Sequence, residues 1–265
     1  MRHEPRKRKP TAAMTKEVSA NPVAYTVDES RIAAAQDGMI AANQELRDHV
    51  DLINAALDFI HRMVIAEPHR SDDHLTLLRL SVRCFNSAAA ALRLVRCGYW
   101  QPAFAVMRDL LETSFLLDLL NRDATEVTRW RTLPEGERKK AFAPVKVREK
   151  LDTHDGCTDR KRQDVYDRLS AYAAHATPEG FVVISPEMMT QVGPFPSEKN
   201  LRAALQELAR HVAAVSAIIG TIVRTEAEET LVLKAAFYDG LQRWSCRYLG
   251  LRQNSMALKD PSNAC

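Results

Sequence analysis

Residues 102–122 read PAFAVMRDLLETSFLLDLLNR, and this stretch decides the fold class. At 100° per residue, its large apolar side chains lie on every side of a helix and leave no continuous polar stripe. These side chains are Phe104, Met107, Leu110, Leu111, Phe115, Leu116, Leu117, Leu119 and Leu120. A helix that is apolar on all sides belongs in the interior of a protein, so the segment predicts the central helix of a bundle.

Helical periodicity continues toward the N-terminus. Apolar residues recur at intervals of three, four or seven from 28 to about 66, with Asp28 as the expected N-cap. Ser71 and the two acidic residues after it predict the start of another helix, which we expect to end at Gly98. Both segments therefore read as long helices on the N-terminal side of the central one.

Toward the C-terminus we expect short helices over 124–156 and 159–174 and two long apolar helices over 197–225 and 227–250. The segment 176–197 is rich in Pro and Gly and reads as a loop, within which FVVI at 181–184 could form one short strand. No internal repeat is found. The whole pattern predicts an all-α fold: a single helical bundle domain over 28–252, behind a disordered basic tail at 1–27 and before a frayed end at 253–265.

The charge is concentrated in that tail. The chain has 37 basic and 34 acidic residues, a formal net charge of +3. The first ten residues hold five basic residues and one acidic residue, which leaves 32 and 33 for the rest. A body that binds duplex nucleic acid usually has a basic face, and here acidic residues elsewhere must offset any such face. The tail itself could contact nucleic acid, or it could be a solvated terminus.

Five scattered cysteines form no metal-binding pattern, and a reducing cytoplasm suits them best. The N-terminus lacks the apolar segment of a secretory signal, and no apolar run approaches the roughly 20 residues of a membrane span. We find no phosphate-binding Gly loop, nucleophile elbow or dinucleotide fingerprint. The sequence therefore predicts a soluble cytoplasmic protein with no membrane partner, no metal and no cofactor.

Two pairs of residues could carry chemistry. Arg108 and Glu112 lie one turn apart among apolar neighbours, so they predict a partly buried ion pair that either shapes a binding site or serves packing. Arg168 and His175 share a helix face, with Tyr172 between them. An Arg beside a His could hold a phosphate while the imidazole transfers a proton, although a surface Arg and a helix-capping His are the plainer interpretation.

The segment 92–120 resembles a recurrent block in bacterial all-helical proteins of unknown function, in which a basic residue and a Gly precede a helix carrying R-x-x-x-E. A later L-S-x-Y-x-x-H element of those proteins matches Leu169, Ser170, Tyr172 and His175. Such proteins are similar to the HEPN superfamily of helical bundles. Many HEPN members are dimeric RNases of toxin–antitoxin and phage-defence systems, with four to six residues between an Arg and a His in a cleft between protomers.

The resemblance implies that Arg168 and His175 are catalytic and that Ser170 and Tyr172 assist binding. Leu169 departs from the polar residue that active members often carry after the Arg. Three functions stay open: a metal-independent RNase or RNA-binding protein, a non-catalytic dimerisation or protein-interaction module, and a binder of small anionic ligands around Arg108 and Glu112. The expected partners are a second copy of the chain, RNA, and an antitoxin or other protein.

Overall fold

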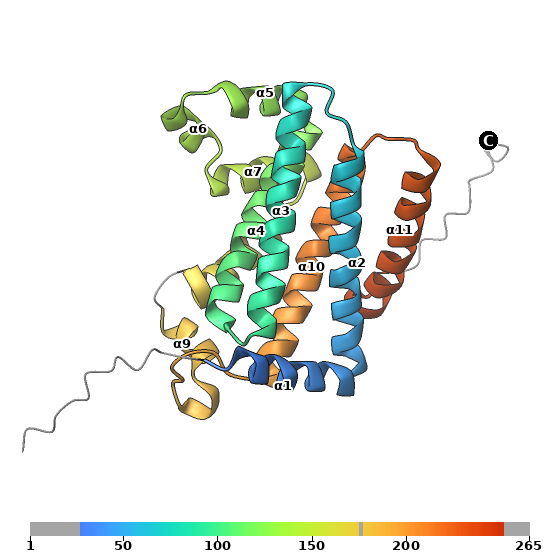
Figure 1. Cartoon of the computed structure of the whole chain (residues 1–265). Coiled ribbons are helices and arrows are strands. Elements are labelled where there is room, and N and C mark those ends of the chain that lie inside the picture. Colours follow the sequence, from blue (N-terminus) through green and yellow to red (C-terminus); the bar gives the residue numbers. More distant parts are fainter. Residues whose placement is uncertain (1–26, 175–176, 252–265) are drawn as a thin grey trace, which may run out of the picture.

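The computed structural model describes residues 27–174 and 177–251, and every regular element in these ranges is a helix (Figure 1). The all-α prediction is confirmed. In chain order the α-helices are α1 (Glu29–Ala42), α2 (Gln44–Ala66), α3 (Asp72–Arg96), α4 (Trp100–Arg122), α5 (Ala124–Thr132), α6 (Glu135–Ala141), α7 (Pro144–Asp155), α8 (Lys161–Leu169), α9 (Pro178–Ile184), α10 (Glu198–Ile222) and α11 (Glu228–Leu249). A π-helix, η1 (Ser170–Ala174), continues α8, and a short 3-10 turn, η2 (Pro186–Met188), follows α9.

The central helix is α4, as its sequence predicts. It packs against α3 and α10 on one side and against α5, α7, α8, η1 and α9 on the other (Figure 1). Met107, Leu110 and Leu117 are completely buried, and Leu119 and Leu120 are almost so. The removal of this apolar surface from water is the main force that holds the neighbouring helices together.

The N-terminal helical segment is two helices rather than one. Asn43 has an extended backbone, and its side chain accepts hydrogen bonds from the amides of Glu45 and Leu46, at 3.0 and 3.3 Å. Asn is among the best N-cap residues, so it ends α1 and starts α2 without loss of the apolar periodicity. Asp28 caps α1 as expected, through a 3.0 Å bond from the amide of Arg31.

The prediction of a short strand at 181–184 is wrong, because this segment lies in α9. Thr177 caps the helix by accepting a hydrogen bond from the amide of Gly180 at 3.1 Å, and Pro178 is its first residue. Both features favour the start of a helix and outweigh the strand preference of Phe-Val-Val-Ile.

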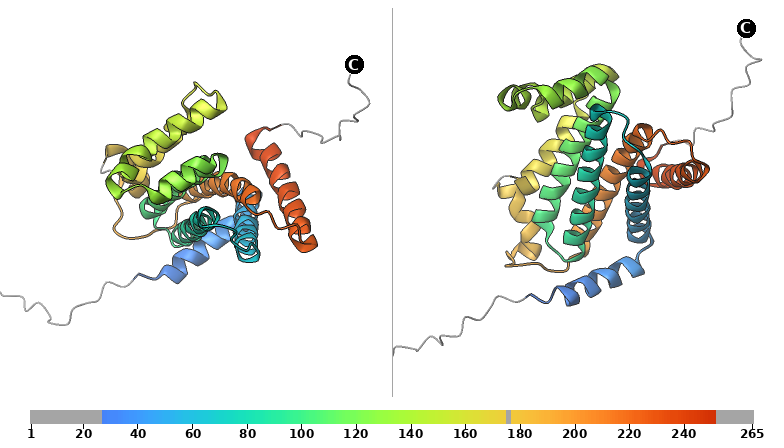
Figure 2. Two further views of the ribbon diagram at one scale, coloured as in Figure 1. Left: turned by 90° about the horizontal axis from the view of Figure 1, so that it is seen from above. Right: turned by 45° about the horizontal axis from the view of Figure 1, so that its top comes forward.

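Helix α11 lies at the edge of the bundle, where it packs on α2 (Figure 2). Phe237 stacks on Phe59 with ring centroids 4.2 Å apart, and the indole of Trp244 donates a 3.0 Å hydrogen bond to Nδ1 of His49. Burial lowers the pKa of His49 more than the charges of Glu45 and Asp48 raise it, which suits a neutral acceptor.

Within the ranges that the structure describes, no helix has both the length and the apolar character needed to span a bilayer. The predicted tail at 1–27 and the predicted frayed end at 253–265 lie outside those ranges, apart from Val27.

Candidate functional site

Arg108 and Glu112 form the predicted ion pair on α4. Nη2 of Arg108 lies 2.9 Å from Oε1 of Glu112, and the two side chains are 24% and 28% exposed. The guanidinium also donates to the hydroxyl of Tyr166 on α8 and lies over its ring, 4.7 Å from the centroid. Arg108 therefore joins α4 to α8 as well as pairing along its own helix.

A second guanidinium contacts the same tyrosine. Arg148 of α7 is buried, and its guanidinium carbon Cζ is 3.9 Å from the centroid of the Tyr166 ring. Its Nε and Nη2 donate to Oε1 of Gln163, at 3.1 and 2.9 Å. Both guanidinium groups therefore pack on the ring of Tyr166, which favours a structural role for these two cations.

Ser170 and Tyr172 lie in η1, which continues the chain beyond α8 against α4. Ser170 is buried, and its hydroxyl has no hydrogen-bond partner among the described residues. Tyr172 is 39% exposed, with its ring 6.5 Å from that of Phe104. His175 lies outside the described residues, so the expected pair of Arg168 and His175 stays a prediction.

Arg168 lines a pocket of about 260 Å³ between α8 and α10, both of which pack on α4. We call it the α8–α10 pocket. Leu111 and Phe115 of α4 form its apolar floor. Its other lining residues are Lys161, Arg162, Val165 and Arg168 from α8, and Glu207, Arg210 and His211 from α10. Arg108 and Glu112 do not line it, so their ion pair and Arg168 lie at separate places around α4.

Glu207 and His211 form a buried pair one turn apart on α10. Nε2 of His211 lies 3.2 Å from Oε1 of Glu207, and the side chains are 7% and 17% exposed, respectively. Burial raises the pKa of Glu207, but His211 and the charges of Arg210 and Arg168 lower it more, so it lies below its ordinary value. The carboxylate is therefore ionised at neutral pH and fixes the orientation of the imidazole beside it.

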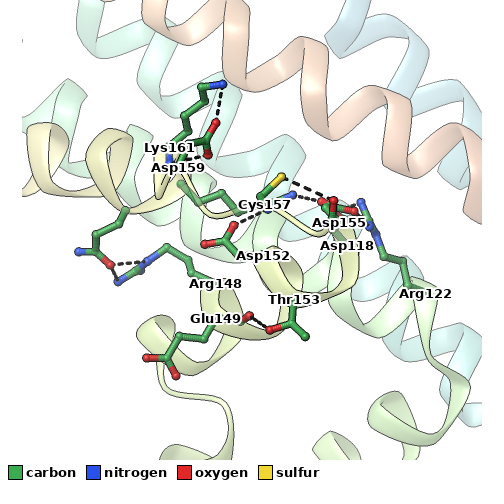
Figure 3. A network of polar contacts seen from close by, with 12 residues as sticks. Asp118, Arg122, Arg148, Glu149, Asp152, Thr153, Asp155, Cys157, Asp159 and Lys161 are labelled. Carbon is green, nitrogen blue, oxygen red and sulfur yellow. Dashed lines mark hydrogen bonds and ion pairs between the residues drawn. The ribbon is translucent and has the colours of Figure 1, made fainter.

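The cations of the α8–α10 pocket differ in how far they are neutralised. Arg162 is bound to Asp152 and Asp155 of α7. Asp155 also binds Arg122 of α4, at 2.5 Å (Figure 3). Lys161 lies 2.6 Å from Asp159. These two cations already have carboxylate partners outside the pocket.

Arg168 and Arg210 are freer to bind an anion. Arg168 is exposed, and its side chain makes no hydrogen bond or ion pair within 27–174 and 177–251, although its charge acts on Glu207. Arg210 is half-buried and lies 3.6 Å from Glu207, which also faces His211. The carboxylate of Glu207 is thus shared among Arg168, Arg210 and His211, which carry or can carry positive charge. An anionic ligand would neutralise the positive charge that remains.

Sequence reasoning missed Glu207, Arg210 and His211. A signal was present, because a Glu and a His four residues apart interrupt an otherwise apolar stretch of α10 and must face each other on a helix. Nothing in the linear sequence indicates that this turn lies opposite Arg168, which is about 40 positions earlier.

The described residues hold no group of three or more His, Cys, Asp or Glu side chains that could bind a metal ion. The chain was also compared with protein-family models, curated proteins and solved structures, and nothing in any of the three matches it.

Proposed function

We propose that this chain binds RNA at the α8–α10 pocket and cleaves it there. One observation carries the proposal: Arg168 and Arg210 flank the buried pair of Glu207 and His211 in a pocket with an apolar floor. Guanidinium groups bind phosphate through paired hydrogen bonds, and histidine is the side chain best suited to proton transfer near neutral pH.

The proposed reaction assigns each group a role. The imidazole of His211 takes the proton of a ribose 2′-hydroxyl, and the oxygen attacks the adjacent phosphorus. The bond from phosphorus to O5′ breaks, and His211 returns the proton to the departing oxygen. The products are a 2′,3′-cyclic phosphate and a 5′-hydroxyl. Arg168 and Arg210 stabilise the negative charge that develops on the phosphate oxygens, and Glu207 orients the imidazole.

The resemblance to the HEPN superfamily adds His175 to this proposal as a second proton donor beside Arg168. Membership of that superfamily, and a role in toxin–antitoxin or phage-defence systems, are supported by the resemblance alone. A cytoplasmic location agrees with the free thiols of Cys84, Cys97, Cys157 and Cys246.

Cleavage of a labelled single-stranded RNA in the presence of EDTA tests the proposal. We expect wild type to release a product ending in a cyclic phosphate, and His211→Asn to slow the reaction at least a hundredfold. The matched control is His154→Asn, which changes an exposed histidine of α7 outside the pocket. Because His211 is buried, Arg168→Gln gives a second variant at an exposed position, and it should weaken binding without loss of folding.

Equal cleavage by wild type and His211→Asn would refute the catalytic role assigned to His211. If His175→Ala is the variant that stops cleavage, the acid–base role belongs to the histidine of the resemblance. Binding that responds to Arg168→Gln without any cleavage by wild type would leave an RNA-binding protein.

The second candidate is a non-catalytic assembly module that binds a second copy or another protein such as an antitoxin. Helix α11 favours it, because Leu231 and Val232 are 50% and 62% exposed near its start and Leu249 is 40% exposed at its end. Exposed apolar residues grouped on one edge helix are typical of interaction surfaces. A protein that stays monomeric and captures no partner would exclude this candidate.

A further inference from the structure

A groove of about 810 Å³ runs between α2 and α11, away from the α8–α10 pocket. We call it the α2–α11 groove. Its apolar base is formed by Leu52 of α2 and by Phe237, Leu241 and Trp244 of α11. The two helices that line it pack on each other at the edge of the bundle (Figure 2). The RNA-binding proposal does not involve this surface.

Small side chains form part of the groove. Ala55 of α2 and Ala236 of α11 are exposed, and Gly240 lies one turn beyond Ala236. Positions with little or no side chain allow another helix to approach at the short end of the usual 8–10 Å separation between packed helices. The groove can therefore accept a helical surface.

The two walls of the groove carry opposite charge. Asp48 and Asp51 lie on the α2 wall, and Arg243 and Arg247 lie on the α11 wall. Asp48 and Arg247 already pair across the groove at 2.6 Å. The side chain of Asp51 makes no hydrogen bond or ion pair with any residue that the structure describes. Among the same residues, the side chain of Arg243 pairs only with Asp239, which lies one turn earlier on α11. Asp51 is thus left for an outside partner, and Arg243, whose one carboxylate partner lies on its own helix, can bind a second carboxylate.

We propose that this groove binds the same groove of a second copy of the chain, with the two-fold axis running along it. Rotation about that axis brings α2 of one copy over α11 of the other, so each acidic wall faces a basic wall. A two-fold axis across the groove would instead bring α2 over α2, with acidic walls facing each other. The charges select the first arrangement.

In this dimer, Asp51 of each copy lies opposite Arg243 of the other. The pairing occurs twice because the interface is symmetric, and the apolar base of each groove is removed from water. A second copy fits better than an unrelated partner, since Asp51 on one wall and Arg243 on the other form a pattern that is complementary to itself.

The test is the mass of the full chain in solution, measured by sedimentation velocity over a concentration series. We expect wild type to sediment as a dimer at micromolar concentration. Asp51→Arg and Arg243→Asp each place like charges opposite each other twice and should raise the dissociation constant at least tenfold. The double variant restores opposite charges and should restore the dimer.

The matched control is Lys139→Glu, a charge reversal at an exposed position of α6, which should leave the dimer intact. Both groove positions are exposed, so the variants should keep the circular dichroism spectrum of wild type. A monomeric wild type would overturn the proposal and leave the groove to another protein. A dimer that both single reversals leave unchanged, or that the double variant fails to restore, would place the interface elsewhere.

Discussion

Replacement of Gly98 by Ala should destabilise the bundle, because both the backbone conformation and the space at this position require a glycine. It lies between α3 and α4 with φ +77°, a conformation that costs a residue with a Cβ about 1–2 kcal/mol. An added Cβ would also lie 2.6 Å from the backbone oxygen of Phe195 and 3.0 Å from Cγ2 of Ile32. Because a backbone atom cannot move aside as a side-chain end can, this overlap adds about 1–3 kcal/mol.

We therefore expect Gly98→Ala to lower the free energy of unfolding by about 2–5 kcal/mol in total, a large part of the roughly 5–15 kcal/mol of an ordinary domain. The same backbone oxygen of Phe195 accepts a 3.0 Å hydrogen bond from the indole of Trp100, so its displacement would disturb α4 as well. Urea unfolding followed by circular dichroism measures the change.

Two other glycines separate the cost of the backbone conformation from the cost of the close contact. Gly250 has φ +65° but nothing within 4 Å of an added Cβ, so Gly250→Ala should cost only the conformational part, about 1–2 kcal/mol. Gly38 lies inside α1 with open space around it, and Gly38→Ala should stabilise by about 0.5–1 kcal/mol. A Gly98→Ala protein no less stable than Gly250→Ala would refute the argument from close backbone approach.

Three further predictions concern titratable groups. The pKa of His49 is lowered in the folded state, so the stabilisation from the neutral imidazole is complete above the unfolded pKa of about 6.5 and is lost as pH falls below that value. His49→Gln should therefore show a smaller fall in urea midpoint between pH 7 and 5 than wild type. Glu67 is buried, and it accepts a 2.9 Å hydrogen bond from the amide of Thr225 and lies 3.0 Å from Arg70. Although burial raises its pKa, the bonds from Thr225 lower it more, so its stabilisation is present at neutral pH and is lost as pH falls through the folded pKa. Glu67→Gln should therefore cost about 1–3 kcal/mol at pH 7 and less in acid, as measured by thermal unfolding. Burial raises the pKa of Cys84 to about 12, so a thiol reagent at pH 8 should label the exposed Cys157 and leave Cys84 unmodified until the protein unfolds, as mass spectrometry of the digest would show.

The sequence predicts most of the fold because local signals and burial agree along most helices. Residues 102–122 are apolar on every side, and α4 is the central helix. The break at Asn43 is harder to see, since the apolar positions keep their spacing across it and only the capping side chain marks the new helix. At 181–184 the strand preference of Val and Ile favours the wrong element, although Thr177 and Pro178 are the start signals of a helix.

The candidate site could be predicted only where its members are close in the sequence. Arg108 and Glu112 are four residues apart, and the helix period brings them together. The sequence also indicates Arg168, but its neighbours Arg210 and His211 belong to α10, a helix about 40 positions later in the chain that packs on the same central helix. Only the tertiary arrangement of α8, α4 and α10 brings these residues to one pocket.

The binding of RNA at the α8–α10 pocket can be measured by the anisotropy of a labelled single-stranded RNA, titrated with wild type, Arg168→Gln and Arg210→Gln at two salt concentrations. We expect each Arg→Gln variant at 168 and 210 to bind about tenfold more weakly and to reduce the dependence of affinity on salt by about one phosphate contact, whereas Arg62→Gln on α2 should do neither. Equal affinity and equal salt dependence for all four proteins, or no binding by wild type, would contradict it.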